Sequence, residues 1–350
     1  LDFQTQKGRM FMRAEPADHE AIADVLSRSF GIQGFAPAIA TEKEMHAVAA
    51  AVQDLLAHEV TDQPFSFKVT ARRSDKSFHL DSYGICCAVG EVVGNCYPQA
   101  SVDLHNPDIT IAVEIRNRAF VYISSSPGPG GLPVGCAGRG LLLLSGGIDS
   151  PVAGFRMAKR GLRQDAIYFH TYPYTSDEAR KKVEDLAGIL SEYIPGLRLF
   201  TVPFTAAQLH INRLGKPEEH TLLMRYAMVK IANMVAARLH ASCLVTGESL
   251  SQVASQTLES LSFTDSASDL LILRPLIGLD KEEIIRTAQD IGSYETSILP
   301  YEDCCTIFSP KHPLVRPDRD ELTDSFARLQ IEPLLEEAAR QTLGQLETGS

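Results

Sequence analysis

The hydrophobic pattern of the chain changes character near residue 125. Before that point, amphipathic helical segments are mixed with strand-like runs, which is typical of an α+β arrangement. The predicted strands are residues 8–13, 37–40, 65–72, 109–115 and 119–124, and the predicted helices are residues 16–29, 41–60 and 81–95.

After about residue 140, short apolar runs alternate regularly with helical segments. Runs that are apolar throughout indicate strands buried on both faces of a parallel sheet. The pattern predicts a doubly wound α/β domain, in which ligands bind beyond the carboxyl ends of the strands. The predicted strands are residues 141–144, 166–170, 197–202, 243–246 and 270–273, and the longest predicted helix is residues 221–239.

A stretch rich in glycine and proline separates these two regions. Residues 124–140 hold six glycines, three prolines and three serines among 17 residues. This composition disfavours regular hydrogen-bonded structure, so we predict a linker at residues 126–140 before a sheet domain at 141–317. Residues 318–350 carry eight acids against three bases and are predicted to be an acidic, helical tail.

Composition narrows the class of protein. The 350 residues are 44% hydrophobic and 22% charged, which predicts a globular protein of about two or three domains. No apolar run is long enough to span a membrane and no secretory leader is visible. Seven cysteines, including two adjacent pairs, fit a reducing cytoplasm better than a disulfide framework. The net charge of −11 disfavours a nucleic-acid partner, but the tail supplies −5 of it and leaves a local binding face possible.

The strongest chemical signal is the sequence SGGIDSP at residues 145–151, directly after the strand predicted at 141–144. Its two glycines permit a sharp turn without a Cβ in the way of an anion. Ser150 is a good N-cap and Pro151 then takes the first helical position, so the helix presents free amides and its positive end to the loop. This predicts a pyrophosphate site, and the missing Gly-Lys-Ser/Thr ending disfavours a Walker-type kinase or GTPase.

SGGIDS resembles the PP-loop of the ATP pyrophosphatase superfamily, whose members split ATP between its α- and β-phosphates. Three further segments narrow the resemblance: FKVTARRSDKSF (67–78), VDLHNPDITIAVEIR (102–116) and PYEDCCTIFSPKHP (300–313). Together they are similar to the tRNA 4-thiouridine synthetase (tRNA uridine sulfurtransferase) family over about residues 8–317. The resemblance implies a truncated ferredoxin-like region at 1–62, a THUMP core at 63–125 (about 20–125 in the broad sense), and a PP-loop domain at 141–317 without a rhodanese domain.

The same resemblance implies an ATP site built from several segments. Gly247 follows a strand, where glycine permits close approach of a ligand. Arg225 lies on a largely apolar helix, where a buried cation needs a phosphate or carboxylate partner. Tyr168 and Phe169 are also interpretable as ordinary strand aromatics. The implied ATP-binding residues are Leu143, Leu144, Ser145, Gly146, Gly147, Asp149, Ser150, Tyr168, Phe169, Arg225, Gly247 and Gln256.

Cys304 and Cys305 lie in a polar, proline-bounded segment, where an exposed thiol can ionise and carry a persulfide. Matching to the family favours Cys304 as the sulfur carrier and leaves Cys305 as an alternative or partner. Cys86 and Cys87, in GICCAVG, are predicted to be buried, and Cys136 and Cys243 to be structural. No Cys-x-x-Cys occurs, so no protein-bound metal site is expected.

The implied reaction has two steps. The O4 atom of a tRNA uridine attacks the α-phosphorus of ATP·Mg²⁺, and the persulfide sulfur on Cys304 then displaces AMP at C4 to give 4-thiouridine at tRNA position 8. Asp149 is expected to position metal or substrate, with helix capping as its alternative role. Lys281 matches a family lysine near the active site, and a surface position at a helix start is equally consistent with its sequence context.

A local basic cluster is the candidate RNA contact. Lys68, Arg72, Arg73 and Lys76 occur in one short segment with His79, and Arg116 and Arg118 flank a predicted turn. Such a cluster can neutralise phosphates, although a solvated charged face explains it equally well from charge alone.

The resemblance implies tRNA, a cysteine desulfurase as persulfide donor, a second copy of the chain in a homodimer, and a ThiS-like sulfur carrier for thiamine thiazole synthesis as further partners. Two other function classes remain open. One is an ATP pyrophosphatase that adenylates a small molecule, and the other is an RNA-binding protein without catalysis. The region before the linker and the Cys304 segment disfavour the first, and the intact SGGIDS sequence disfavours the second.

Overall fold

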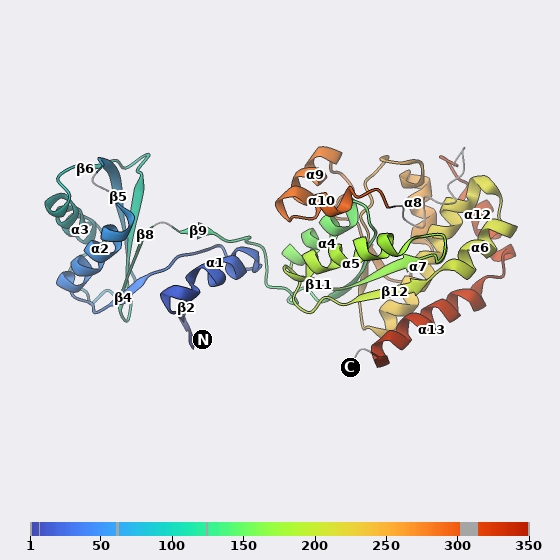
Figure 1. Cartoon of the computed structure of the whole chain (residues 1–350), viewed down its shortest axis with the longest axis horizontal. Helices are drawn as coiled ribbons and strands as arrows, with labels where there is room; N and C mark the ends of the chain where they lie inside the picture. The colour runs from blue at the N-terminus through green and yellow to red at the C-terminus, as the bar shows by residue number, and fades with distance from the viewer. Residues whose placement is uncertain (1, 7, 61–62, 124, 302–313, 349–350) are drawn as a thin grey trace. The chain divides into compact units, whose positions relative to one another are not determined.

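The computed structural model describes residues 2–6, 8–60, 63–123, 125–301 and 314–348. These form two compact units, Leu1–Gly130 and Gly131–Ser350 (Figure 1).

The first unit is built on a five-stranded sheet with the order β4-β8-β7-β5-β6. β5 pairs in parallel with β6 and β7, whereas β8 pairs antiparallel with β7 and β4. The helices α2 and α3 cover one face, because the inward side chains of β5 and β7 pack against them in a single core. The strands are β4 (Ile39–Thr41), β5 (Phe65–Arg73), β6 (Ala100–Val102), β7 (Ile109–Ile115) and β8 (Ala119–Ile123), and the helices are α2 (Met45–Glu59) and α3 (Ser82–Cys96).

A hairpin of β1 (Asp2–Gln6) and β2 (Arg9–Arg13) contributes to the other face of this sheet. Phe11 of β2 stacks on Phe120 of β8 with ring centroids 4.2 Å apart, and Arg9 pairs with Glu114 of β7. The helix α1 (His19–Arg28) follows, preceded by the short helix η1 (Pro16–Asp18), and β3 (Gly34–Phe35) pairs with β9 (Ser126–Pro127). The predicted helix 41–60 starts four residues later than expected, because Thr41 belongs to β4.

The second unit contains the predicted parallel sheet, and all five of its predicted strands are present. The spatial order β12-β11-β10-β13-β14 corresponds to 3-2-1-4-5 in chain order, so the chain reverses direction across the sheet between β10 and β13. In a doubly wound sheet this reversal opens a crevice at the carboxyl ends of the two central strands. The strands are β10 (Arg139–Leu143), β11 (Arg163–His170), β12 (Leu199–Pro203), β13 (Cys243–Val245) and β14 (Leu271–Leu273).

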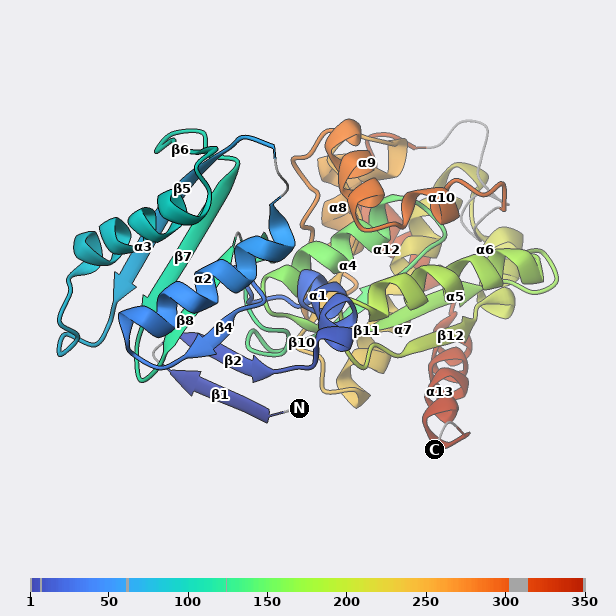
Figure 2. The ribbon, with the colours of Figure 1, turned by 60° about the vertical axis from the view of Figure 1, so that its left-hand side comes forward.

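Helices cover both faces of this sheet (Figure 2). α4 and α5 lie on one face, because right-handed crossovers place the helices of β10-β11-β12 together, and α7 lies on the other. The helices are α4 (Asp149–Lys159), α5 (Asp177–Ser191), α6 (Thr205–Leu214), α7 (His220–Arg238), α8 (Leu258–Asp265), α9 (Lys281–Asp290), α10 (Tyr294–Ser297), α12 (Arg319–Arg328) and α13 (Glu332–Thr348), with the short helices η2 (Pro217–Glu219) and η3 (Ala254–Gln256).

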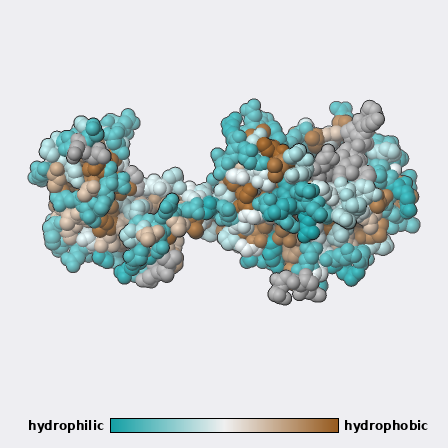
Figure 3. Space-filling view, in the orientation of Figure 1, coloured by the Kyte–Doolittle hydropathy of each residue, from teal (hydrophilic) through white to brown (hydrophobic). Residues whose placement is uncertain are grey.

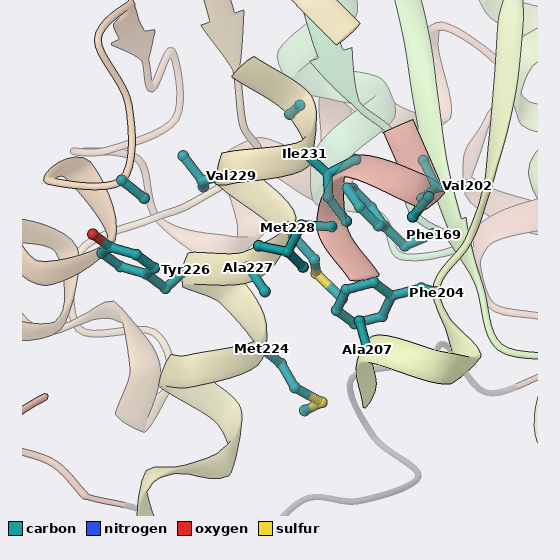
Figure 4. Packing of buried hydrophobic residues seen from close by; sticks show 14 of the residues in the cluster. Phe169, Val202, Phe204, Ala207, Met224, Tyr226, Ala227, Met228, Val229 and Ile231 are labelled. Atoms are coloured by element: carbon teal, nitrogen blue, oxygen red, sulfur yellow. The ribbon is translucent and has the colours of Figure 1, made fainter. Parts of the chain in front are cut away.

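The helix α7 is apolar almost all round and is buried along most of its length. In Figure 4, Met228 and Ile231 point towards Phe169, Val202 and Phe204 of the sheet side, whereas Tyr226 points the other way. Tyr226 stacks there on Phe263 of α8, with ring centroids 4.6 Å apart.

Residues 318–350 are predicted to be an acidic tail beyond the sheet domain, but the two helices within residues 318–348 pack into the core of that domain. Leu322, Phe326, Leu335 and Ala338 of α12 and α13 are buried in the same cluster as α7, and α13 contacts α7 and β12. Their acidic side chains occupy the outer faces of the helices, so the net charge of the segment concealed its apolar stripe.

The predicted linker is held by hydrogen bonds in both units. Ser126–Pro127 pairs with β3 in the first unit, and in the second the N–H of Leu132 donates to the Lys159 carbonyl at 3.0 Å. Gly131 has φ +76° and a Cβ there would meet the Lys159 oxygen at 2.3 Å, so glycine is required at this position.

The visible surface of each unit is largely hydrophilic with small apolar patches (Figure 3). Among the described residues, no helix is long and apolar enough to cross a membrane.

Candidate nucleotide site and its surroundings

The SGGIDS sequence occupies the crevice position of the sheet. β10 ends at Leu143 and the loop begins at Ser145, and the segment Thr246-Gly247-Glu248 follows β13, the strand next to β10. Two strands that meet at the reversal of a doubly wound sheet therefore both end in the predicted site residues.

Two serine hydroxyls close the loop on itself. The Ser150 Oγ accepts a hydrogen bond from the Ser145 N–H at 2.9 Å and lies 3.0 Å from the Ser145 Oγ, which in turn accepts from the Gly147 N–H at 3.3 Å. The predicted capping was wrong by two residues. α4 begins at Asp149 with Ile148 as N-cap, so Ser150 closes the loop rather than capping the helix.

Gly247 packs against the backbone of this loop. A Cβ at Gly247 would lie 2.7 Å from the Ser150 nitrogen and 2.8 Å from the Asp149 carbonyl carbon, which are backbone atoms that cannot move aside. Only glycine fits here, because β13 must bring its carboxyl end directly onto the amino end of α4. The packing of these two segments is therefore enough to require glycine at position 247, without any contact to a ligand.

Asp149 is held from two other segments. The Lys281 Nζ lies 2.6 Å from the Asp149 Oδ1, and the Gln252 Nε2 donates to the Asp149 Oδ2 at 3.0 Å. Lys281 is the first residue of α9, whose start is fixed by a capping box between Asp280 and Glu283. The side chain of Asp149 is only 23% exposed, so Asp149 and Lys281, two predicted catalytic residues, form a partly buried ion pair.

Arg225 has the carboxylate partner that its burial required. It pairs with Glu248, which also accepts from the Arg274 Nε at 2.6 Å and from the Thr246 hydroxyl at 2.8 Å. Three residues of this site were not predicted from the sequence: Glu248, Arg274 and Gln252. The spacing of Glu248 directly after Gly247 was the signal that could have identified the first of them.

The remaining predicted nucleotide contacts differ in what they offer. Tyr168 and Phe169 are 2% and 5% exposed, and Phe169 packs edge-on against Phe204, so its ring belongs to the core. Gln256, in η3, is 8% exposed, and its Oε1 is buried without a hydrogen-bond partner in the part of the chain that the structure describes. Leu143 is the last residue of β10 and Leu144 follows it, so their backbone lies beside the loop at the edge of the site.

Cys304 and Cys305 lie outside the described residues, but both flanks of their segment are described. Before it, the carbonyl of Leu299 accepts a hydrogen bond at 2.8 Å from Lys182 of α5, a lysine only 5% exposed. After it, the carbonyl of Val315 accepts at 2.9 Å from Thr257, which caps α8. Lys182 lies in the second turn of α5, the helix that follows β11, and Thr257 lies at the start of α8, a helix that follows β13.

The other cysteines only partly match their predictions. Cys243 is buried, and burial raises the pKa of its thiol. Cys87 is exposed and Cys86 half-buried, so the prediction that both are buried was wrong for Cys87. The helix α3 has core contacts through Ile85, Val89 and Val93, which leaves Cys87 on its outer side. Cys136 is also exposed.

The candidate RNA-binding residues of the first unit are not equivalent. Arg72 and Lys76 are exposed, whereas Arg73 donates to the carbonyls of Phe78 and Leu80 and so orders that loop. Lys68 donates to the carbonyl of Leu104 at 3.1 Å.

Arg116 is only 6% exposed and its Nε pairs with Glu114 at 2.9 Å, so its charge is neutralised inside the sheet rather than displayed as predicted. Burial raises the pKa of Glu114, but the hydrogen bonds from Arg116 and Arg9 outweigh this and lower it.

Across residues 2–301 and 314–348, leaving out the undescribed positions, no three His, Cys, Asp or Glu side chains gather closely enough to hold a metal ion. A cation at the SGGIDS loop would have Asp149 as its nearest protein ligand from that loop, in competition with Lys281.

The fold and loop together define the second unit as an α/β protein of the PP-loop class, in which a glycine loop at the sheet reversal faces the start of a helix. Comparison with known proteins identifies the family. The sequence model of the family described as "Thiamine biosynthesis protein (ThiI)" matches residues 135–331, and the THUMP domain model matches residues 42–124.

Individual relatives agree with these matches. A probable tRNA sulfurtransferase of Treponema pallidum (strain Nichols) is 48% identical over 95% of this chain and 84% of its own length, and one of Clostridium kluyveri is 42% identical over 97% and 88%. A crystal structure of a 4-thiouridine synthetase–RNA complex with bound ATP superposes with a TM-score of 0.90 at 35% identity, covering 96% of this chain and 88% of that one. The chain belongs to the tRNA sulfurtransferase (ThiI) family, as the sequence resemblance predicted.

Proposed function

We propose that this protein binds ATP at the SGGIDS loop and uses it to convert a tRNA uridine into 4-thiouridine. The observation that supports this most directly is the loop itself. Ser145 and Ser150 close it at the reversal point of the sheet, and Gly247 packs onto it without room for a side chain. The whole chain superposes with a TM-score of 0.90 on a 4-thiouridine synthetase that holds ATP and RNA, which supports the same assignment.

In the first step, the O4 atom of uridine attacks the α-phosphorus of ATP and pyrophosphate leaves. The role proposed for the loop amides and the start of α4 is to stabilise the negative charge that builds on the pyrophosphate. Arg225, held by Glu248 and Ser255, and Lys281, after it turns from Asp149, supply positive charge beside the pyrophosphate. Mg²⁺ would neutralise phosphate charge, with Asp149 as its candidate protein ligand once Lys281 turns to the phosphates.

In the second step, the terminal sulfur of a Cys304 persulfide bonds to C4 and AMP leaves. A second thiol then attacks the Cys304 sulfur, which releases 4-thiouridine and leaves a disulfide that an external dithiol reduces. Cys305 is the candidate for this second thiol. The anchors at Leu299 and Val315 support a location near the nucleotide, because both lie by helices that begin at the site edge of the sheet.

The deciding experiment is incubation of the full chain with unmodified tRNA, ATP, Mg²⁺, dithiothreitol, cysteine and a cysteine desulfurase, followed by nucleoside analysis. We expect 4-thiouridine in the complete mixture and none without ATP. Cys304→Ser should abolish the product and leave tRNA affinity unchanged. Cys305→Ser should still form the persulfide on Cys304 if Cys305 is only the second thiol, and should form none if Cys305 is the carrier. ATP turnover that depends on a small acid, without 4-thiouridine, would instead favour the small-molecule adenylating alternative.

The first unit is the part of the chain that we propose to bind tRNA. Of the five cations predicted to contact RNA, Arg72 and Lys76 are exposed and Lys68 is partly exposed, whereas Arg73 and Arg116 make contacts inside the unit. The matched family is described as a thiamine biosynthesis protein, which supports sulfur delivery for thiamine as a second use of the same persulfide. Transfer of label from a Cys304 persulfide to a ThiS-like carrier protein tests that use separately.

A further inference from the structure

A single buried carboxylate connects two arginines at the end of β13. The side chain of Glu248 is 7% exposed, and it pairs with both Arg225 and Arg274, whose side chains are 21% and 12% exposed. The Thr246 hydroxyl donates a third hydrogen bond, at 2.8 Å, to the same carboxylate. A buried carboxylate with three donors is well compensated for the loss of its water.

The bridge joins elements that are far apart in sequence. Arg225 belongs to α7, and Arg274 follows β14 directly. Arg274 also reaches Asp265 at the end of α8, with its Nη2 2.5 Å from the Asp265 Oδ1. Glu248 therefore connects α7 directly, and α8 through Arg274, to the segment after β13 that holds Gly247.

The bridge fixes the guanidinium group of Arg225. One of its terminal nitrogens pairs with Glu248, and the other donates to the Ser255 Oγ at 3.0 Å, next to Gln256. An arginine held at two nitrogens keeps one orientation, so little rotamer entropy is lost when it meets a phosphate.

We infer that Glu248 is a positioning residue for nucleotide binding: it holds Arg225 in the orientation in which Arg225 meets ATP, and it does not contact the nucleotide itself. This inference rests on the proposed function, since it requires ATP to bind at the SGGIDS loop. It adds a residue and a role that the family resemblance did not imply.

A double-mutant cycle tests the inference through the dissociation constant of a non-hydrolysable ATP analogue, measured by calorimetry on the full chain. Glu248→Gln should weaken binding about tenfold, as expected for loss of a charged hydrogen bond that orders the ligand-binding group. In an Arg225→Met background, Glu248→Gln should change the dissociation constant less than about twofold, because the group it positions is already absent. Equal factors in the two backgrounds would overturn the positioning role.

Three further measurements exclude misfolding, a general effect of losing a carboxylate, and a role in metal binding as causes of the loss. Glu248→Asp, tested in the same two backgrounds, replaces Glu248→Gln if thermal unfolding shows that the latter is not folded, and should show the same dependence on Arg225. Glu337→Gln removes an exposed carboxylate paired with Arg340 and should leave binding unchanged. A loss that appears only when Mg²⁺ is present would assign Glu248 to the metal and refute the inference. If the unmodified chain fails to bind the analogue, the proposed function fails, whereas binding with additive losses removes only the role of Glu248.

Discussion

The charged residues proposed to bind ligands are organised in opposite ways in the two units. In the second unit, Asp149, Lys281, Glu248 and Arg225 come from separate segments and are paired in a partly buried site. In the first unit, Arg72 and Lys76 are close in sequence and exposed on or next to a single strand. Paired, desolvated charges keep fixed positions and suit recognition of one small ligand, whereas exposed charges are screened by salt and suit a long phosphate backbone.

The largest expected effect is the loss of thiolation activity in Gly247→Ala, which disturbs the paired site of the second unit. The added methyl group would meet the backbone of Ser150 at 2.7 Å, so the loop or β13 must shift. A displacement of about 1 Å of a binding group can cost about a hundredfold in rate, and we expect at least that loss in thiolation.

The matched control is Gly278→Ala, because nothing lies within 4 Å of a Cβ at Gly278. Single-turnover thiolation of both variants makes the comparison. Equal activities would show that the contact between β13 and the loop is not needed for nucleotide binding.

Lys281→Ala tests the ion pair with Asp149. Loss of one fixed charge at a developing anion costs about a hundredfold in kcat, and we expect a decrease of that order. Gln252→Ala should be milder, about fivefold, because it removes one neutral donor to Asp149.

Steady-state kinetics with varied ATP measure both variants. Lys181→Ala, an exposed lysine paired with Asp185 on α5, serves as the control and should keep full activity. Unchanged kcat and kcat/KM in Lys281→Ala would show that Lys281 has no role in the reaction at this site.

Arg72→Ala and Arg116→Met sharpen the difference between exposed and buried cations within the first unit. Arg72→Ala should weaken tRNA binding about threefold. It should also reduce the slope of the logarithm of the binding constant against the logarithm of the salt concentration by about one. Arg116→Met should instead lower the free energy of unfolding by about 1–3 kcal/mol, because Glu114 loses a buried partner.

Filter binding across a salt series and denaturant unfolding separate the two effects. A loss of tRNA affinity for Arg116→Met, with stability unchanged, would contradict the buried-pair interpretation.

The smallest expected effect concerns His170 at the end of β11. Burial, with the charge of Arg180 adding to it, lowers the pKa of His170 from 6.5. The unfolded chain therefore binds the proton more readily below about pH 6.5, so stability falls as the pH is lowered, by no more than about 1.4 kcal/mol per pH unit for one proton.

His170→Gln should reduce this pH dependence, measured as the free energy of unfolding between about pH 7.5 and 5.5. His46→Gln, an exposed histidine on α2, is the comparison. A steeper pH dependence in the His170 variant would reverse the assigned sign.

Several wrong predictions from the sequence share one cause: the role of each residue depended on a contact that only the folded chain shows. The acidic count of residues 318–350 concealed Leu322, Phe326 and Leu335, which pack into the core. Arg116 was counted as a surface cation because its partner Glu114, two residues earlier on β7, is recognised only in the folded sheet, where Glu114 pairs with both Arg116 and Arg9 of β2. Ser150 was assigned as a cap, although its hydroxyl turns back to Ser145.

The order of apolar and polar residues determined which segments are strands, that the second sheet is parallel, and that SGGIDS lies between a strand and a helix. These properties are local, because they follow from side-chain period and from the conformational freedom of glycine. Tertiary structure alone decided which charges meet. Glu248 reaches Arg225 and Arg274, and Asp149 reaches Gln252 and Lys281, across 23 to 132 positions of sequence. Such pairs depend on how strands are ordered in the sheet, and one sequence carries no periodic signal for that order.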